Sequence, residues 1–266
     1  MLDLEFALLS DPGRVRTQNE DYVGHVVPGS PAMARSHGWL FALADGVGGQ
    51  RKGEVASRAA VQEVVAGFQR AKPSTPPKDL MNQLVQAANA RICETDAVFG
   101  ASGRGMASTI VASTLRFDRA TIAHVGDSRC YLIRSNDARQ LTRDHTVAAD
   151  QQRLGVLSAE EAAQSESRHV LSRSLGANLF VSVEIDEVQL MPGDVLLQCS
   201  DGLYGGVTSS EIAETINRNR SLETAARELV ARANEQDGSD NISVQLVRIR
   251  SVERIGMYRG RPYKLR

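Results

Sequence analysis

The stretch LFALADGVGGQ, residues 40–50, ends a hydrophobic run on an acid and continues into glycines. The apolar residues 38–44 predict a strand that is buried on both faces, so Asp45 stands where that strand reaches the surface. The glycines beyond it allow other atoms to approach the backbone closely, because glycine has no side chain. Since Asp-Gly is also a common turn signal, the meaning of this stretch depends on whether other acids stand at similar strand ends.

The composition is that of an ordinary globular protein. The chain has 266 residues, 42% hydrophobic and 24% charged, and its net charge of −1 gives no overall attraction to nucleic acid. Three widely spaced cysteines, Cys93, Cys130 and Cys199, predict buried, reduced thiols. The first residues have no basic flank typical of a signal peptide, and no apolar run approaches the roughly 20 residues of a membrane span. We therefore expect a soluble, cytoplasmic monomer.

The first hundred residues predict three strands and then two helices. Strands are expected at 4–10, 22–27 and 38–44. A helix is expected over Glu54–Arg70, where apolar residues recur every four positions on one face. The proline-rich segment 71–79 ends this helix, and a second helix is expected over Asp79–Ala97.

After residue 105 the strands come in quick succession. Strands are expected at 106–117, 120–126, 130–134, 181–190, 194–200 and 241–249. The intervening stretch 142–179 is polar, broken and only weakly helical. Two more helices are expected over Ser209–Asn217 and Ser221–Glu235.

The order of these elements decides the fold class. Strands follow one another in antiparallel-looking runs, and helices come in adjacent pairs, which argues against alternating βαβ units and a parallel sheet. The pattern favours an α+β fold of four layers, αββα, in which two antiparallel sheets pack together and a helix pair covers each. We expect one domain over residues 1–250.

The end of the chain differs from the rest in charge. From residue 250 onward it contains six basic residues and a single acid, Glu253. A disordered, solvated tail over 251–266 is the simplest interpretation of this composition.

Acids recur at the margins of the predicted strands. Asp45, Asp127 and Asp201 follow apolar runs, while Asp240 and the pair Glu20–Asp21 precede them. Each acid alone has a simpler explanation as a turn former. If they converge, however, two like charges 4 Å apart repel by roughly 4 kcal/mol at an effective dielectric near 20, and the cluster would need cations.

The chemistry of these residues indicates which cations. Carboxylate oxygens favour Mg²⁺ or Mn²⁺, whereas the five histidines show no zinc-like spacing and His124 lies inside a predicted strand. Two such ions repel one another, so a ligand must bridge them, and Asp45 is the candidate bridge with the Gly46 carbonyl beside it. A two-metal site suits phosphate esters. Arg14 and Arg16, just before the acidic pair, could bind the phosphoryl group.

Eight segments of the chain resemble, in order, the motifs of the metal-dependent type 2C Ser/Thr protein phosphatases, the PPM family. The match spans roughly residues 5–250, and its order makes it specific where any single motif would be weak. The segments are RTQNED (16–21), ADGVGG (44–49), GMASTIVAS (105–113), AHVGDSRCYL (123–132), LTRDHT (141–146), LSRSLG (171–176), LLQCSDGLYGGV (196–207) and DNISVQLV (240–247).

The resemblance implies the same αββα sandwich and a role for each acid. Asp45, Asp201 and Asp240 would bind a first metal ion, and Asp45 with the Gly46 carbonyl a second, whose waters Glu20 and Asp21 hold. Asp127, with Asp201, would hold a weaker third ion, and Arg16 would bind the substrate phosphate. Residues 142–180 would form a flap beside the cleft, with a role in substrate choice.

The resemblance also implies a mechanism and a setting. A metal-bridging hydroxide would attack phospho-Ser or phospho-Thr directly, without a phospho-enzyme, and the enzyme would oppose a bacterial Ser/Thr kinase. One departure is that Val47 and Gln50 stand where many relatives carry a histidine. A metal-bound water, held by Gln50, would therefore supply the proton to the leaving group. Two alternatives stay open: a non-catalytic phosphoprotein-binding pseudo-phosphatase and a phosphatase of small phosphate esters.

Overall fold

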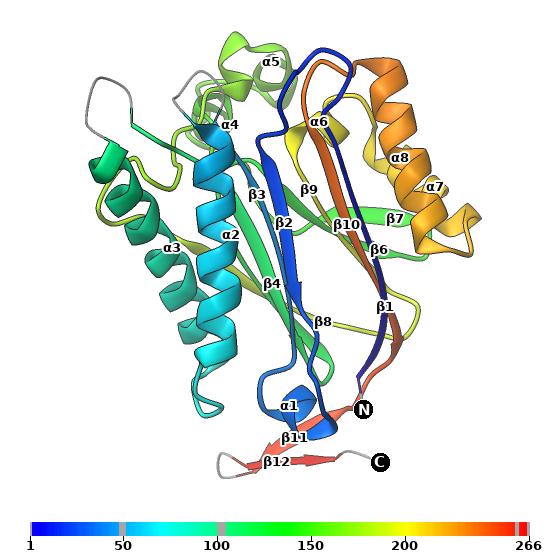
Figure 1. Ribbon diagram of the computed structural model, residues 1–266. Helices are drawn as coiled ribbons and strands as arrows, with labels where there is room; N and C mark the ends of the chain where they lie inside the picture. The colour runs from blue at the N-terminus through cyan, green and yellow to red at the C-terminus, as the bar shows by residue number, and fades with distance from the viewer. Residues whose placement is uncertain (1, 48–51, 100–104, 259–260, 265–266) are drawn as a thin grey trace.

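The strands of the molecule form two antiparallel sheets that pack face to face (Figure 1). The computed structural model describes residues 2–47, 52–99, 105–258 and 261–264. One sheet has the order β1 (Asp3–Asp11), β10 (Ile242–Ser251), β9 (Val195–Cys199), β6 (Arg129–Arg134), β7 (Asp137–Gln140). The other has the order β2 (Asp21–Val26), β3 (Trp39–Asp45), β4 (Ile110–Arg116), β5 (Arg119–Val125), β8 (Glu184–Gln189).

A pair of helices covers the outer face of each sheet (Figure 1). Helices α2 (Gly53–Arg70) and α3 (Pro77–Phe99) cover the β2–β8 sheet, and α7 (Ser209–Arg218) and α8 (Leu222–Gln236) cover the other. The four-layer αββα fold predicted from the order of elements is therefore confirmed. Within the described ranges, no helix has the length and apolar character needed to cross a membrane.

Strand β3 is buried on both faces, as its unbroken apolar sequence predicts. Leu40 and Ala42 point to the helix layer and belong to the core under α2 and α3. Phe41 and Leu43 point the other way, into the core between the two sheets, because successive side chains of a strand alternate between faces. Asp45 thus ends a strand that packing fixes from both sides.

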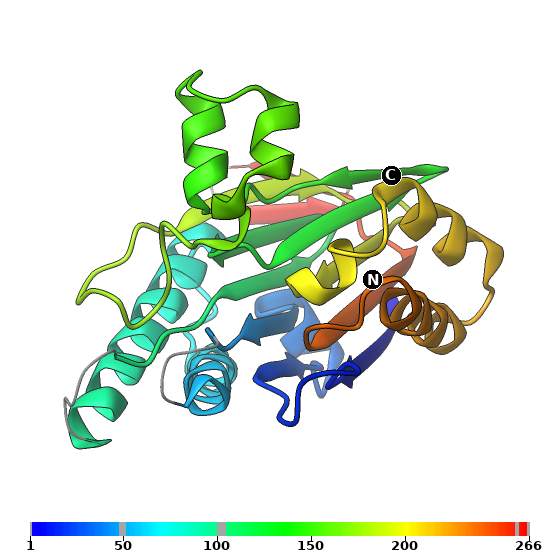
Figure 2. The same ribbon diagram turned by 90° about the horizontal axis from the view of Figure 1, so that it is seen from above.

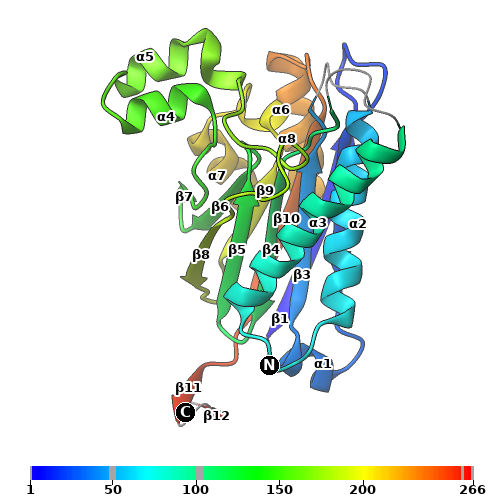
Figure 3. The same ribbon diagram turned by 90° about the vertical axis from the view of Figure 1, so that its left-hand side faces the viewer.

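The flap, residues 142–180, is more ordered than its polar sequence predicts. It contains helices α4 (Val147–Arg153) and α5 (Ala159–Gln164) and the 3₁₀ turn η1 (Glu166–His169). Side-chain caps explain the short helices: the Thr146 hydroxyl accepts from the Ala149 amide, and Ser158 and Glu161 form a capping box around α5. Figures 2 and 3 show α4 and α5 projecting from one end of the sandwich.

Further short elements were not expected from the sequence. Helix α1 (Pro31–Ser36) begins at a Ser30 cap, and α6 (Asp201–Tyr204) follows β9 directly. Strands β11 (Ile255–Tyr258) and β12 (Arg261–Lys264) pair with one another in an antiparallel hairpin. The expectation of a disordered tail is wrong for these two strands, because pairing satisfies their backbone groups whatever their charge. A boundary at residue 250 stays a prediction.

The cysteines are free thiols in the structure. Cys130 and Cys199 are fully buried, as their strand positions predict, whereas Cys93 on α3 is only partly buried. Burial raises the pKa of the Cys130 thiol to about 12, so this group stays protonated at neutral pH.

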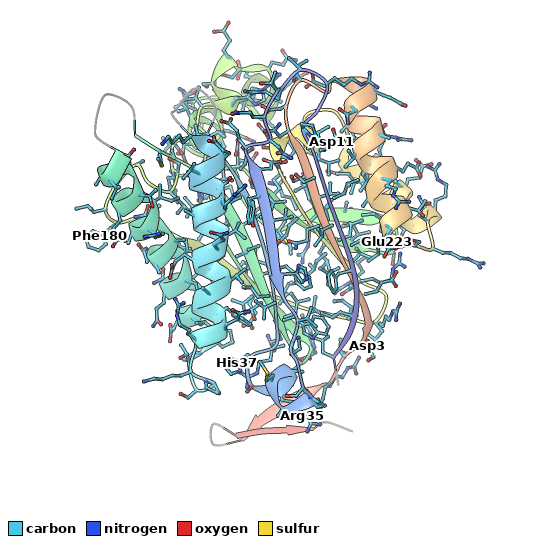
Figure 4. The ribbon with its side chains drawn as sticks, viewed as in Figure 1. Asp3, Asp11, Arg35, His37, Phe180 and Glu223 are labelled. Carbon is cyan, nitrogen blue, oxygen red and sulfur yellow. The ribbon has the colours of Figure 1, made fainter. Side chains whose placement is uncertain are left out.

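Replacing Phe41 with alanine should destabilise the fold strongly. Phe41 is fully buried between the sheets, and emptying such a site costs roughly 3–5 kcal/mol in the free energy of unfolding. Urea denaturation measures this loss. Phe180→Ala is the matched control: Figure 4 shows Phe180 at the periphery, 86% exposed, so the change should stay within about 0.5 kcal/mol. Equal losses in both variants would contradict a core between the sheets.

Candidate active site

Acidic side chains from five separate segments line one cleft at the flap end of the sandwich. The cleft has a volume of about 600 Å³, and Arg16 and Gly46 line it as well. The acids come from the β1–β2 turn, the end of β3, the segment after β5, the start of α6 and the segment before β10: Glu20, Asp45, Asp127, Asp201 and Asp240. Seven of the eight residues predicted for the site therefore meet here, and Asp21 lies behind the wall. Arg14 does not line the cleft.

Strand register places Asp21 directly beside Asp45, since the two residues pair across β2 and β3. Asp21 is buried, and one of its oxygens accepts a 2.7 Å hydrogen bond from the Ser200 hydroxyl. Its other oxygen has no partner in the protein. Burial, together with neighbouring acids, raises the pKa of Asp21 to about 7.

Ser108 and Thr109, the two residues just before strand β4, fix the backbone of Asp45. The Asp45 amide donates to the Thr109 hydroxyl at 2.9 Å, and its carbonyl accepts from the Ser108 hydroxyl and the Thr109 amide, both at 2.8 Å. The Thr109 hydroxyl also contacts the Ser128 hydroxyl at 2.7 Å, one residue after Asp127. These bonds hold the strand ends of two acids at a fixed separation.

Two glycines let the start of α2 approach the strand end. A Cβ on Gly46 would lie 2.3 Å from the Gly53 carbonyl group, and a Cβ on Gly53 would lie 2.8 Å from Glu20 Oε1. The Gly46 amide also donates to the Glu20 carbonyl at 3.0 Å. The close approach expected after Asp45 therefore exists at Gly46, while Gln50 and the two glycines before it lie outside the described residues.

Burial makes the ionised form of these acids unfavourable. It raises the pKa of Asp127 to about 8 and that of Asp45 well above its usual range, and in both cases neighbouring carboxylates add to the effect. The pKa of Asp201 is also raised, by burial first and then by Asp240. Without a compensating cation, Asp127 would therefore hold a proton at neutral pH.

The donor set fits hard divalent cations. Every candidate ligand is an oxygen, which favours Mg²⁺ or Mn²⁺ over zinc. One oxygen each of Asp21 and Asp201 is buried without a hydrogen-bond partner, which is costly in a protein that has nothing else to bind there. Five of these acids line one cleft, so several oxygen donors face the same space.

Arg16 stands at the rim of the cleft, where it forms an ion pair with Asp240. Its Nη2 lies 2.7 Å from Asp240 Oδ2, although the two residues are far apart in sequence. The Arg16 side chain is 43% exposed, so its guanidinium remains accessible from solvent. This position suits an anion that enters the cleft.

The flap contributes residues to the cleft that sequence reasoning missed. Arg168, His169 and Leu171 line it, next to Val47, which offers no proton. The sequence of residues 142–180 has no periodicity that points to the site. The only signal was the resemblance of the chain to the PPM family, which implies a flap beside the cleft.

A second polar cluster joins both ends of the flap to the sheet. The rings of His124 and His145 stack at 4.7 Å, and Glu184 lies beside them. One possible ligand atom from each of His124, His145 and Glu184 lies within 4.8 Å of the other two. Arg143 and Arg173 already pair with Glu184, however, so the cluster is satisfied by the protein's own cations.

His145 also links the flap to the segment that carries Asp127. Its Nδ1 accepts from the Gly126 amide at 3.1 Å, and its own amide donates to the Gly126 carbonyl at 3.0 Å. Burial lowers the pKa of His145 to about 4, with His124 and Arg173 adding to the effect, so the ring is neutral near pH 7. The two histidines are 21 positions apart in the sequence, which explains why spacing did not reveal the cluster.

A sandwich of two sheets whose strand ends carry buried carboxylates around a cleft defines a metal-dependent hydrolase suited to phosphate esters. The chain belongs to the protein phosphatase 2C family, whose model matches residues 15–247.

Similar proteins cover nearly the whole chain. The serine/threonine phosphatase stp of Listeria welshimeri is 33% identical over 258 residues, which cover 95% of this chain and 96% of the relative. The protein phosphatase PhpP of Streptococcus pneumoniae is 33% identical over 92% of this chain and 97% of its own length. The solved Mycobacterium tuberculosis phosphatase PstP/Ppp superposes with a TM-score of 0.82 at 29% identity, covering 93% of this chain and 99% of that one.

Another solved structure bears on the metal. The catalytic domain of the phosphatase PstP in complex with two manganese ions is similar to this chain with a TM-score of 0.79 and 29% identity. The similarity covers 94% of this chain and 99% of that one. A relative that binds manganese in its solved structure therefore has the same fold over nearly its whole length.

Raising the pH should destabilise the metal-free protein. The folded-state pKa values of Asp21 and Asp127, about 7 and about 8, exceed the roughly 3.9 of an unfolded aspartate. The folded state therefore binds more protons than the unfolded state from about pH 4 to about pH 8, and the stability they supply is lost as the pH rises through this window. We expect the Tm in chelator to fall across it, and Mn²⁺ to restore the Tm.

Two variants sharpen this test. Asp21→Asn cannot ionise, so it should flatten the fall of Tm with pH. Asp137→Asn on β7 changes an exposed acid away from the cleft and should leave the slope unchanged. A metal-free protein that becomes more stable over the same window would contradict the raised pKa values.

Proposed function

We propose that this protein is a metal-dependent phosphoprotein phosphatase that hydrolyses phospho-Ser and phospho-Thr. The observation that carries the proposal is the cleft itself, in which carboxylates from five distant segments meet beside Arg16. The named phosphatases to which the chain is similar support the same activity. A phosphorylated protein that is a Ser/Thr kinase or its target, a cytoplasmic location and a monomeric state belong to the same proposal.

The acids would divide among the ions as follows. Asp45, Asp201 and Asp240 would hold one ion, and Asp45 with the Gly46 carbonyl would hold a second, whose waters Glu20 and Asp21 would hold. Asp127 and Asp201 would hold a weaker third ion. When bound, such ions generate hydroxide at neutral pH and neutralise the phosphoryl charge.

The protein's own groups complete the reaction. Arg16 would bind the phosphoryl oxygens and orient the ester for in-line attack by water on phosphorus. The water loses a proton as its oxygen bonds to phosphorus, the bond between phosphorus and the Ser or Thr oxygen breaks, and the leaving oxygen takes up a proton. Ester and water thus become free phosphate and the Ser or Thr hydroxyl. The hydrogen bonds of Thr109 and Ser108 would keep Asp45 from shifting during this step.

The two alternatives predict different behaviour. A pseudo-phosphatase would bind phosphoproteins without releasing phosphate, but this chain retains every acid that such a protein would be expected to lose: Asp45, Asp201 and Asp240. A phosphatase of small esters would hydrolyse an aryl phosphate well and a phosphopeptide poorly.

Replacing Asp45 with asparagine should abolish activity, because the variant loses the charge that two ions would share. We expect less than about 1% of the wild-type rate of Mn²⁺-dependent phosphate release from a phospho-Thr peptide, since one bridging charge supports several kcal/mol of transition-state stabilisation. Chelator should abolish the wild-type rate as well. Retention of more than a few per cent in Asp45→Asn would refute the bridging role.

Asp127→Ala is the comparison variant for the third ion. It should slow turnover but leave the tighter Mn²⁺ sites intact in titration calorimetry, because Asp127 would not contact those ions. Loss of the tight sites in this variant would show that Asp127 belongs to the core pair instead.

Arg16→Ala should raise KM more than it lowers kcat. A charge-assisted contact to phosphate contributes about 1.5–3 kcal/mol, which corresponds to roughly a 10- to 100-fold loss in kcat/KM. Steady-state kinetics on the phosphopeptide measure the two constants. Arg14→Ala removes an equal charge two residues away, outside the cleft, and should change neither constant by more than about twofold. A loss confined to kcat would mean that Arg16 contacts the phosphoryl group only in the transition state.

A further inference from the structure

A second pocket adjoins the catalytic cleft and shares its rim. It has a volume of about 410 Å³ and lies between the flap helices and α6. Arg168, His169 and Gly205 line both hollows, so the two are continuous. A chain whose phosphorylated residue occupies the cleft can extend into this pocket without leaving the protein surface.

The flap wall of the pocket is built from small aliphatic side chains. Ala148 and Ala162 are buried, and three further alanines of α4 and α5 complete the wall: Ala149, Ala159 and Ala163. Alanine leaves room for another chain because its side chain is a single methyl group. This wall suits an extended peptide segment.

The opposite wall is polar but its charges are already paired. Arg129 binds Asp144 through Nε and Nη2, with Nη2 2.6 Å from Asp144 Oδ2, and its guanidinium lies 3.5 Å from the centre of the Tyr204 ring. The Tyr204 hydroxyl donates to the Asp127 carbonyl at 3.0 Å. This wall is therefore rigid, electrically balanced and tied to the catalytic cleft.

The shared rim carries a cation without an acidic partner. Arg168 donates from Nε to His169 Nε2 at 2.8 Å and from Nη1 to the Ala163 carbonyl at 3.1 Å. Among the residues for which coordinates are described, no carboxylate lies within ion-pair distance of Arg168. Its side chain is exposed, so an acid brought by a ligand can reach it.

We propose that this pocket is the subsite for the substrate segment next to the phosphorylated residue, and that Arg168 selects an acidic side chain in that segment. The inference rests on the proposed phosphatase function and adds a class of substrate to it: phosphoproteins with Asp or Glu close to the phospho-Ser or phospho-Thr. The continuity of the two hollows and the free charge of Arg168 carry the argument.

Paired phosphopeptides test this selection. One phospho-Thr peptide carries Glu on both sides of the phosphorylated residue, and the other carries Gln at the same positions, so they differ in charge but hardly in shape. A charge-assisted contact predicts a kcat/KM roughly five- to tenfold higher for the Glu peptide with the wild-type enzyme. Arg168→Gln should remove this difference, so that the variant hydrolyses the two peptides with equal kcat/KM.

Two further variants separate the subsite from general effects. Arg153→Gln removes the same charge from exposed α4, outside both hollows, and should keep the preference for Glu. Ala159→Phe should fill the pocket from an exposed position, lowering kcat/KM for both peptides but not for the aryl phosphate. Equal rates on both peptides with the wild type, or a preserved preference in Arg168→Gln, would overturn the proposal.

The failure of the proposed function is distinguishable from failure of the subsite. If the wild-type protein released no phosphate from the aryl ester with Mn²⁺, the phosphatase function would fail. The subsite would then be tested by fluorescence anisotropy with the same two peptides. Tighter binding of the Glu peptide, lost in Arg168→Gln, would support the subsite, and equal binding would overturn it.

Discussion

The mutual repulsion of buried carboxylates is the constraint on which the rest of this structure depends. Two unit charges 4 Å apart repel by roughly 4 kcal/mol at an effective dielectric near 20, and this site gathers several. The fold withstands that cost because rigid elements hold the acids, most clearly Asp45 at the end of a strand that is buried on both faces. Burial first, and then the neighbouring carboxylates, raise the pKa values of Asp21 and Asp127, so the folded protein binds protons more tightly at these groups.

Hydrogen bonds behind the cleft connect the catalytic acids to the flap. The segment of Asp127 is held on one side by His145, at the start of the flap, and on the other by Tyr204 of α6. Arg129 stacks on Tyr204 and also pairs with Asp144, which belongs to the flap. The position of the flap, and with it the proposed peptide subsite, is therefore fixed by the same residues that hold an acid of the cleft.

Local patterns explain what the sequence predicted well. The four-residue apolar period of α2 and the unbroken apolar run of β3 reflect burial on one face and on both faces respectively, so they predicted the layers correctly. The flap helices were missed because they are short and depend on caps, although Ser158 and Glu161 display a capping box in the sequence. The terminal hairpin was missed because composition alone carries no information on strand pairing.

The sequence by itself determined which residues are acidic, which strands they end and which family's motifs they form. Only the tertiary structure decided that Asp21 lies beside Asp45 and behind the wall of the cleft, that Arg16 pairs with Asp240, and that His124 meets His145. It alone also revealed the pocket with Arg168 at its rim. The physical reason is that periodicity reports which face of one element is buried, whereas contacts between distant segments depend on how the elements pack and in which register the strands pair.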